Sequence, residues 1–169
     1  MWTAPFPPGK GVGDEVEHGY KGKGVTTHLL TEGNGLPLAA TGTGAAGNER
    51  DQVGKLFERV RVYHGYGRPK RCTHEMHADK GYDSKALRIF LRNKGIRPVI
   101  PRRVWKTKKQ TPGRKLPKSR DRWKVERCFA WMQRKFRRLV VRWERRSKYW
   151  NGFIQLGIVM MWVNKLICG

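Results

Sequence analysis

At 169 residues the chain is long enough for a single sizeable core, so we expect one domain spanning residues 1–169. Hydrophobic residues make up 38% of the chain and aromatic residues 11%, which excludes wholesale disorder. The formal net charge of +24 indicates a polyanionic partner.

The positive charge is confined to the second part of the chain. Residues 1–60 contain six Lys or Arg against seven Asp or Glu, whereas residues 61–169 contain 31 against six. A merely solvated face is a poorer explanation, because so many like charges repel one another without a partner. Nucleic acid is therefore the expected partner. Membrane-surface binding is the weaker alternative, because Pro and Gly interrupt the basic stretch and no clean amphipathic pattern is present.

The first part of the chain predicts an irregular start, a hairpin and a helix. Residues 1–24 are rich in Gly and Pro and should be irregular. Two short apolar runs, 25–31 and 36–41, flank an Asn-Gly pair, which is typical of a β-hairpin. Asn48 can cap a helix that runs to about residue 62 with an apolar face.

The second part predicts a strand, a helix and a second strand, followed by a loop and two helices. We expect a strand at 74–78, a helix at 85–94 that Asp83 or Ser84 caps and Gly95 ends, and a strand at 96–100. Residues 102–120 form a basic loop with little apolar content. Helices follow at 122–136 and 152–167, and residues 139–143 are compatible with either strand or helix. The fold class is therefore α/β, with a central mixed sheet flanked by helices.

The cysteines and the last apolar segment bear on location. The three cysteines are far apart and odd in number, which suits a reducing cytoplasm better than a disulfide framework. No secretory segment opens the chain. The apolar stretch 153–167 is too short to span a bilayer and contains three polar residues, so we expect a core helix and no membrane association.

Two carboxylates are the candidate catalytic residues. Asp79 follows a predicted strand, and Glu126 lies 47 positions later on a basic helix. Phosphodiester chemistry is well served by divalent cations that carboxylates from separate elements bind beyond the ends of strands. Each residue also has an ordinary interpretation, Asp79 as a cap and Glu126 as the partner of a neighbouring Arg in a helix ion pair.

Other side chains allow two further interpretations. Cys72, His74 and His77 are metal-ligand types near Asp79, but the spacing of a zinc site is incomplete. Among the tryptophans, Trp105 in the basic loop is the best candidate to stack on bases. By contrast, Trp123 and Trp131 are expected to be core or partly buried.

Several blocks of the sequence resemble a known family. They are TTHLLTEGNGLPLA, GNERDQ, ADKGYDSKALRIFLRNKGIRPVIPRR and RWKVERCFAWMQRKFRRLVVRWERR. They resemble the C-terminal part of the catalytic domain in bacterial insertion-sequence transposases of the DDE class, insertion-sequence-five group. The resemblance runs from about residue 7 to 167. It implies an RNase H-like fold and an Asp, Asp, Glu triad that binds Mg²⁺ or Mn²⁺. The implied reaction is cleavage and strand transfer at transposon ends.

The resemblance also implies roles for individual residues. The family's second Asp falls on Asp79 and its Glu on Glu126, and Arg122 and Arg134 match basic positions around that Glu. Ser119 stands where the family usually has Tyr, and the family's first Asp has no counterpart after Met1. We therefore expect an N-terminally truncated transposase product. The alternative is a catalytically inactive, basic DNA-binding remnant.

The expected partner is double-stranded DNA, both transposon ends and target, for a cytoplasmic protein at the bacterial nucleoid. Two protein partners are also expected: a second copy of the chain in a homodimer, or a full-length transposase that complements it. The residues predicted to contact DNA share a positive charge or an exposed aromatic ring: Lys80, Arg102, Arg103, Trp105, Lys106, Lys108, Lys109, Arg122 and Arg134.

Overall fold

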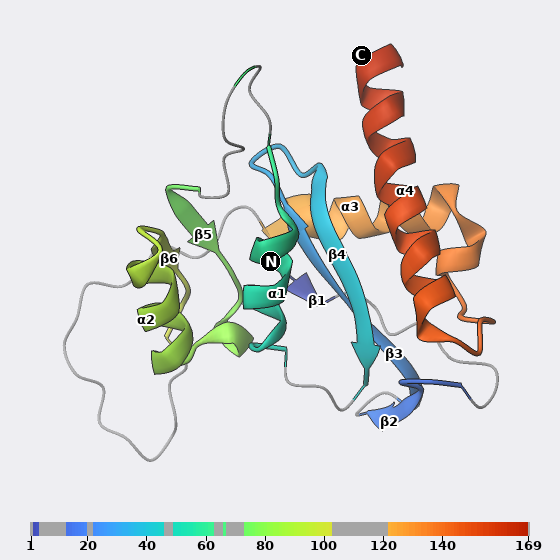
Figure 1. The fold of residues 1–169 in the computed structure, drawn as a ribbon, viewed down its shortest axis with the longest axis horizontal. Coiled ribbons are helices and arrows are strands. Elements are labelled where there is room, and N and C mark those ends of the chain that lie inside the picture. The colour runs from blue at the N-terminus through green and yellow to red at the C-terminus, as the bar shows by residue number, and fades with distance from the viewer. Residues whose placement is uncertain are drawn as a thin grey trace.

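A computed structural model describes residues 2–3, 13–19, 22–45, 49–62, 66, 73–102 and 122–168. The chain is mixed α/β, as predicted, with helices packed around two separate sheets (Figure 1). The basic segment 103–120 and the predicted cap Asn48 lie outside the described residues.

The larger sheet is built on the predicted hairpin. Its four strands are β1 (Trp2–Thr3), β2 (Glu17–Gly19), β3 (Gly22–Thr31) and β4 (Pro37–Gly44). All pairings are antiparallel, with Val25 opposite Gly44 and Leu29 opposite Ala40, while β2 and β1 pair with the first and the later part of β3. The connection at 32–36 is a wider loop than a two-residue turn. Gly35 has φ +95°, a conformation that favours glycine.

The smaller sheet is a parallel pair with a helical crossover. Strands β5 (Glu75–His77) and β6 (Arg97–Val99) are joined through the 3₁₀ turn η1 (Lys80–Tyr82) and helix α2 (Lys85–Asn93). Ser84 caps α2, since its Oγ accepts a hydrogen bond from the amide of Leu87 at 3.1 Å. Gly95, with φ +72°, follows the helix as predicted.

The prediction of one central mixed sheet is wrong for the described part of the chain. The antiparallel strands β1 to β4 form one sheet, and β5 and β6 form the other. Within the described residues β1 has only two residues, and both pair with β3. No described strand therefore connects the two sheets by hydrogen bonds.

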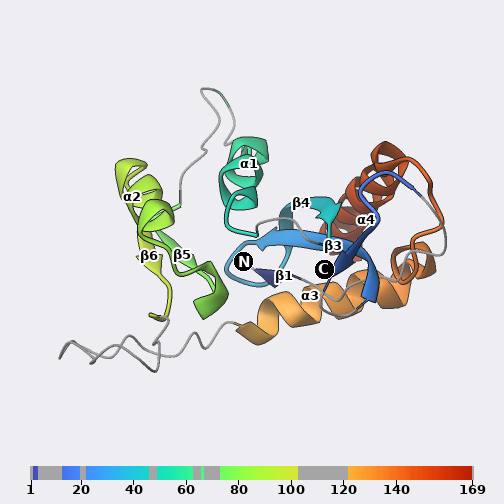
Figure 2. The ribbon, with the colours of Figure 1, turned by 90° about the horizontal axis from the view of Figure 1, so that it is seen from below.

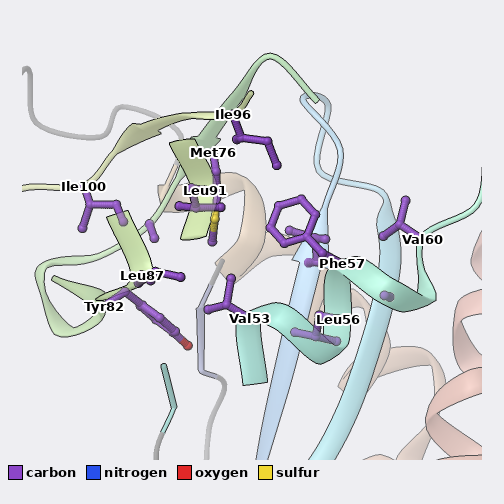
Figure 3. Close-up of a cluster of buried hydrophobic side chains, with 13 residues drawn as sticks. Val53, Leu56, Phe57, Val60, Met76, Tyr82, Leu87, Leu91, Ile96 and Ile100 are labelled. Atoms are coloured by element: carbon purple, nitrogen blue, oxygen red, sulfur yellow. The ribbon is translucent and has the colours of Figure 1, made fainter. Parts of the chain in front are cut away.

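Two hydrophobic cores lie on opposite faces of the β3–β4 hairpin. Leu30 and Ala39 face the first core, which α1 (Gln52–Arg59) shares with β5, α2 and the residues that flank β6 (Figure 3). Leu29 and Ala40, their neighbours in sequence, face the second core, which α3 and α4 cover. Figure 2 accordingly shows α1 and α3 on opposite sides of the hairpin. The first core joins the two sheets although their strands do not pair.

The last part of the chain contains α3 (Arg122–Lys135), the 3₁₀ turn η2 (Arg137–Leu139) and α4 (Ser147–Cys168). Helix α3 covers the predicted range within the described residues, apart from its last residue. In contrast, α4 has 22 residues and is longer than predicted, because it begins five residues earlier, at Ser147, and ends one residue later, at Cys168.

The prediction of a core helix holds for only part of α4. Trp150, Ile154 and Ile158 are buried, whereas Leu166 and Ile167 are 78% and 77% exposed. By length and composition alone α4 could cross a membrane. Only 22% of its apolar 18-residue stretch is buried inside the protein. Core helices of soluble proteins often meet the same criteria, so this is weak evidence for a membrane span.

Candidate catalytic site

Asp79 lies on the turn that follows β5, as predicted. It is half-buried and is the N-cap of η1, where its Oδ1 accepts a hydrogen bond from the amide of Lys80 at 2.7 Å. Asp79 therefore does act as a cap, but the cap uses only Oδ1, one of its two carboxylate oxygens. Since Ser84 caps α2, Asp79 is not needed for that helix.

Arg50 supports this turn and was missed in the sequence. Its Nε donates to the carbonyl oxygen of Gly81 at 3.1 Å, which ties the residues before α1 to η1 across 31 positions. The GNERDQ block, which contains Arg50, was noted in the sequence, but nothing in it indicated that Arg50 contacts Gly81. The contact connects this block directly to the Asp79 block.

Glu126 lies on α3 beside Arg122. The Arg122 Nε and Glu126 Oε1 atoms are 2.9 Å apart, and both side chains are 54% exposed. The ordinary interpretation, an ion pair between residues i and i+4 of a helix, is therefore confirmed. At this exposure the pair contributes little stability, on the order of 0.3–0.5 kcal/mol. The carboxylate consequently lies at the surface and is accessible to a ligand.

The two carboxylates come from separate elements. The N-terminal end of α3, which carries Glu126, is the end of that helix nearest to β5 and η1 in both views (Figures 1 and 2). Among the described residues no group of three or more His, Cys, Asp and Glu side chains is placed to bind a metal ion. The described part of the chain thus contributes two separate carboxylates and no complete ligand set.

The donor chemistry suits magnesium or manganese. Both cations prefer oxygen ligands, and Mg²⁺ is often bound by one or two carboxylates with water and substrate phosphate oxygens completing the shell. The exposed Glu126 and the half-buried Asp79 satisfy that requirement. The assignment of Asp79 and Glu126 as ligands of the ion stays a prediction.

The predicted DNA contacts fall into two groups. Lys80, Arg102 and Arg134 are exposed, and Arg122 pairs with Glu126. The other predicted contacts lie outside the described residues: Arg103, Trp105, Lys106, Lys108 and Lys109.

The tryptophans of α3 differ from their prediction, and His77 has a local partner. Trp123 and Trp131 are 51% and 38% exposed rather than buried, because α3 packs on the sheet through its other face. His77 Nε2 lies 3.1 Å from Glu75 Oε2, and Arg97 pairs with the same carboxylate. Cys72 lies outside the described residues.

These features define a class: a basic, mixed α/β domain with a strand-end Asp and a helix Glu. The family model of the transposase DDE domain matches residues 2–162, and the chain therefore belongs to the DDE transposase family. The insertion-sequence-five group is not confirmed by this match and stays a prediction.

A relative from Burkholderia cepacia supports the family. It is assigned by name as a transposase for insertion sequence element IS402 and is 39% identical over 144 residues, which is 85% of this chain. This confirms the predicted resemblance to insertion-sequence transposases. The match spans 64% of the relative's length. No solved structure matches the chain significantly.

Proposed function

We propose that the chain is the catalytic part of an insertion-sequence transposase that cleaves DNA at transposon ends and joins it to target DNA. One observation carries the proposal: Asp79 directly follows strand β5 of the parallel sheet, and the N-terminal end of α3, the helix of Glu126, is the end of that helix nearer to β5 (Figures 1 and 2). Family membership supports the same conclusion.

Each residue has a role in this proposal. Asp79 and Glu126 bind Mg²⁺ or Mn²⁺, and the bound ion stabilises negative charge on the oxygens of the phosphodiester. Arg122 orients Glu126 through their ion pair. Lys80, Arg102 and Arg134 contact the DNA phosphates. The third carboxylate that the family uses lies, in this proposal, on an upstream strand that would join an RNase H-like sheet.

The cellular setting follows from the same proposal. The protein acts on double-stranded DNA in the bacterial cytoplasm, at the nucleoid. Because the proposal assigns two of the family's three carboxylates to Asp79 and Glu126, the third comes from an upstream segment of the same protein, a further copy or a full-length transposase.

The test restores the upstream part. Residues of the Burkholderia relative that lie outside the match and carry an Asp-containing strand are fused in front of residue 2, and magnesium-dependent nicking of transposon-end DNA is measured. We expect nicking, and we expect Asp79→Asn and Glu126→Gln to lower its rate more than about 100-fold, because residues that merely orient metal ligands already cost about 10–100-fold. Glu58→Gln, an amide substitution at an exposed glutamate of α1, is the matched control and should leave the rate unchanged.

Equal activity of the fusion and its Asp79→Asn variant would overturn the proposal. Binding to end DNA without nicking would then favour the second candidate, a DNA-binding protein without catalytic activity. The ion pair between Arg122 and Glu126 and the lack of a three-ligand group among the described residues support this candidate.

A further inference from the structure

Helix α4 carries a second apolar stripe that no described part of the domain covers. Its members recur at the alternating three- and four-residue spacing of a heptad repeat, the pattern of helices that pair along their length. They are Tyr149, Gly152, Leu156, Val159, Val163 and Leu166. All six are exposed, and the exposed Met160 and Ile167 widen the stripe. These eight residues form the α4 seam.

The seam lies opposite the side of α4 that packs on the larger sheet. Trp150, Ile154 and Ile158 on that inner side are buried in the second core. At the pitch of an α-helix the seam points away from these three residues. Figure 1 also shows the last turns of α4 projecting beyond the sheet. A helix that is apolar on two opposite sides needs a partner on each, and the described part of the domain supplies one.

The seam is large enough for a stable protein interface. Its seven large apolar side chains are between 39% and 78% exposed, an accessible area of the same order as the roughly 800 Å² that each partner buries in a stable complex. Exposed apolar patches of this size mark interaction sites. Lipid is a poorer occupant than protein, because Gln155 and Trp162 hold the helix on β4 through hydrogen bonds to backbone carbonyl oxygens. Lipid therefore cannot surround α4.

The pattern of the seam favours a second copy of the same helix. A stripe with heptad spacing packs along a matching stripe with its side chains interdigitated. Two copies of the chain can therefore use this one surface about a two-fold axis, the commonest symmetry of protein dimers. The seam contains no charged residue. Two copies with a net charge of +24 each repel one another, so an uncharged stripe is the surface on which they can meet.

We infer that two copies of this chain pair through their α4 seams into a symmetric dimer. The dimer does not rest on the proposed function, since the seam contains neither Asp79, Glu126 nor any proposed DNA contact. Within the proposed function, the seam is the surface on which a further copy of the chain docks. The attraction is apolar and the repulsion between copies is electrostatic. Added salt should therefore strengthen the dimer, although it weakens DNA binding.

The test is the mass of the full chain in solution, measured by sedimentation equilibrium without DNA or divalent metal. Protein and salt concentrations are varied, and we expect a monomer–dimer equilibrium that tightens as salt is added. Leu156→Glu should raise the dimer dissociation constant more than about 100-fold, because like charges then meet at the seam. Ile89→Glu places the same charge at an apolar side chain of α2 that is 46% exposed, and it should leave the constant unchanged.

A charge-swapped pair separates loss of the interface from loss of the fold. Leu156→Lys alone should also be monomeric, and mixing it with Leu156→Glu should restore a measurable dimer, since opposite charges then meet. No recovery on mixing, an unchanged equilibrium in Leu156→Glu, or a wild-type chain that stays monomeric at every concentration would overturn the inference.

Lipid binding is the remaining alternative occupant. Binding of a monomeric wild-type chain to uncharged phosphatidylcholine vesicles, abolished by Leu156→Glu, would assign the seam to lipid and overturn the dimer. Uncharged vesicles are used because a chain of +24 binds anionic ones through its charge alone. Since none of these measurements involves DNA, a failure of the dimer is distinguishable from a failure of the upstream fusion to nick.

Discussion

His28 shows how one buried side chain makes the stability of this protein depend on pH. It lies in β3 with no exposed surface, and its Nε2 is 2.7 Å from the Oγ1 of Thr43 on β4. Burial, and secondarily the positive charge of Lys55, lower the pKa of His28 to about 4. The neutral imidazole is therefore the form that the fold accommodates.

We expect acid to destabilise the protein through His28. Its folded-state pKa lies below the unfolded value of 6.5, so the unfolded chain binds a proton that the folded chain does not. The stabilisation is complete above pH 6.5 and is lost as the pH falls toward about 4, with a total on the order of 3 kcal/mol. Urea unfolding measured across this range should show the loss.

A matched pair of variants assigns the effect to this residue. His28→Gln, which cannot take up the proton, should lower stability at neutral pH and flatten the acid-side slope. His18→Gln, at an exposed histidine of β2, should leave the slope unchanged. Parallel pH profiles for the wild type and His28→Gln would contradict the assignment.

At the scale of elements, α4 protects the outer edge of the larger sheet. Side chains along α4 bind backbone groups of β4. Asn151 Oδ1 accepts a hydrogen bond from the amide of Gly42 at 2.8 Å. Gln155 Nε2 donates to the carbonyl oxygen of Ala40 at 2.8 Å, and Trp162 Nε1 donates to that of Pro37 at 2.6 Å. An open strand edge invites pairing with another chain, so these contacts both dock the helix and cover the edge.

Close approach of α4 to β4 depends on Gly42. A Cβ atom there would lie 2.9 Å from Cδ1 and 3.1 Å from Nε1 of the buried Trp150. We expect Gly42→Ala to lower the free energy of unfolding by about 1–3 kcal/mol, as for other overpacked cores. Chemical denaturation measures this value.

Gly152→Ala is the internal control on the partner helix. A Cβ atom at Gly152 would meet nothing within 4 Å, and alanine is the better helix former by roughly 0.5–1 kcal/mol. This variant should be slightly more stable than the wild type. Equal effects of the two substitutions would show that the fit between Gly42 and Trp150 is not what limits the packing.

On the scale of the whole molecule, the charge of +24 is expected to dominate the proposed interaction with DNA. Each phosphate neutralised by Lys or Arg releases counterions, so the affinity falls linearly with salt on a double logarithmic plot, with a slope of about −0.9 per contact. The exposed Lys80, Arg102 and Arg134 are the described residues proposed to make such contacts.

We expect neutralising one proposed contact to lower the magnitude of this slope by about one. Arg134→Gln and Lys80→Gln are the test variants. Lys165→Gln removes an equal charge from the exposed end of α4 and should change the slope little. Binding isotherms of duplex DNA over a range of salt concentrations measure the slopes. Identical slopes for the variants and the wild type would exclude these residues as phosphate contacts.

Local sequence patterns determined most of the secondary structure. The hairpin around Asn34 and Gly35, helix α2 between Ser84 and Gly95, and the existence of helix α3 were predicted correctly. Each depends on nearby residues, such as a cap, a glycine with positive φ or an apolar period. The position of Asp79 after a strand was predicted for the same reason. Family membership, too, could be inferred from contiguous blocks.

Only the tertiary structure decided how these pieces combine. Two sheets replace the single predicted sheet, since strand pairing depends on which edges meet. Trp123 and Trp131 are exposed because α3 presents another face to the core. Arg142 is buried at 1% exposure and donates to the carbonyl oxygens of Glu144 and Arg145, although basic residues surround it in the sequence. Composition and periodicity predict which residues suit an interior. Contacts between distant segments determine which of them occupy it, and the energy of those contacts is absent from any local pattern.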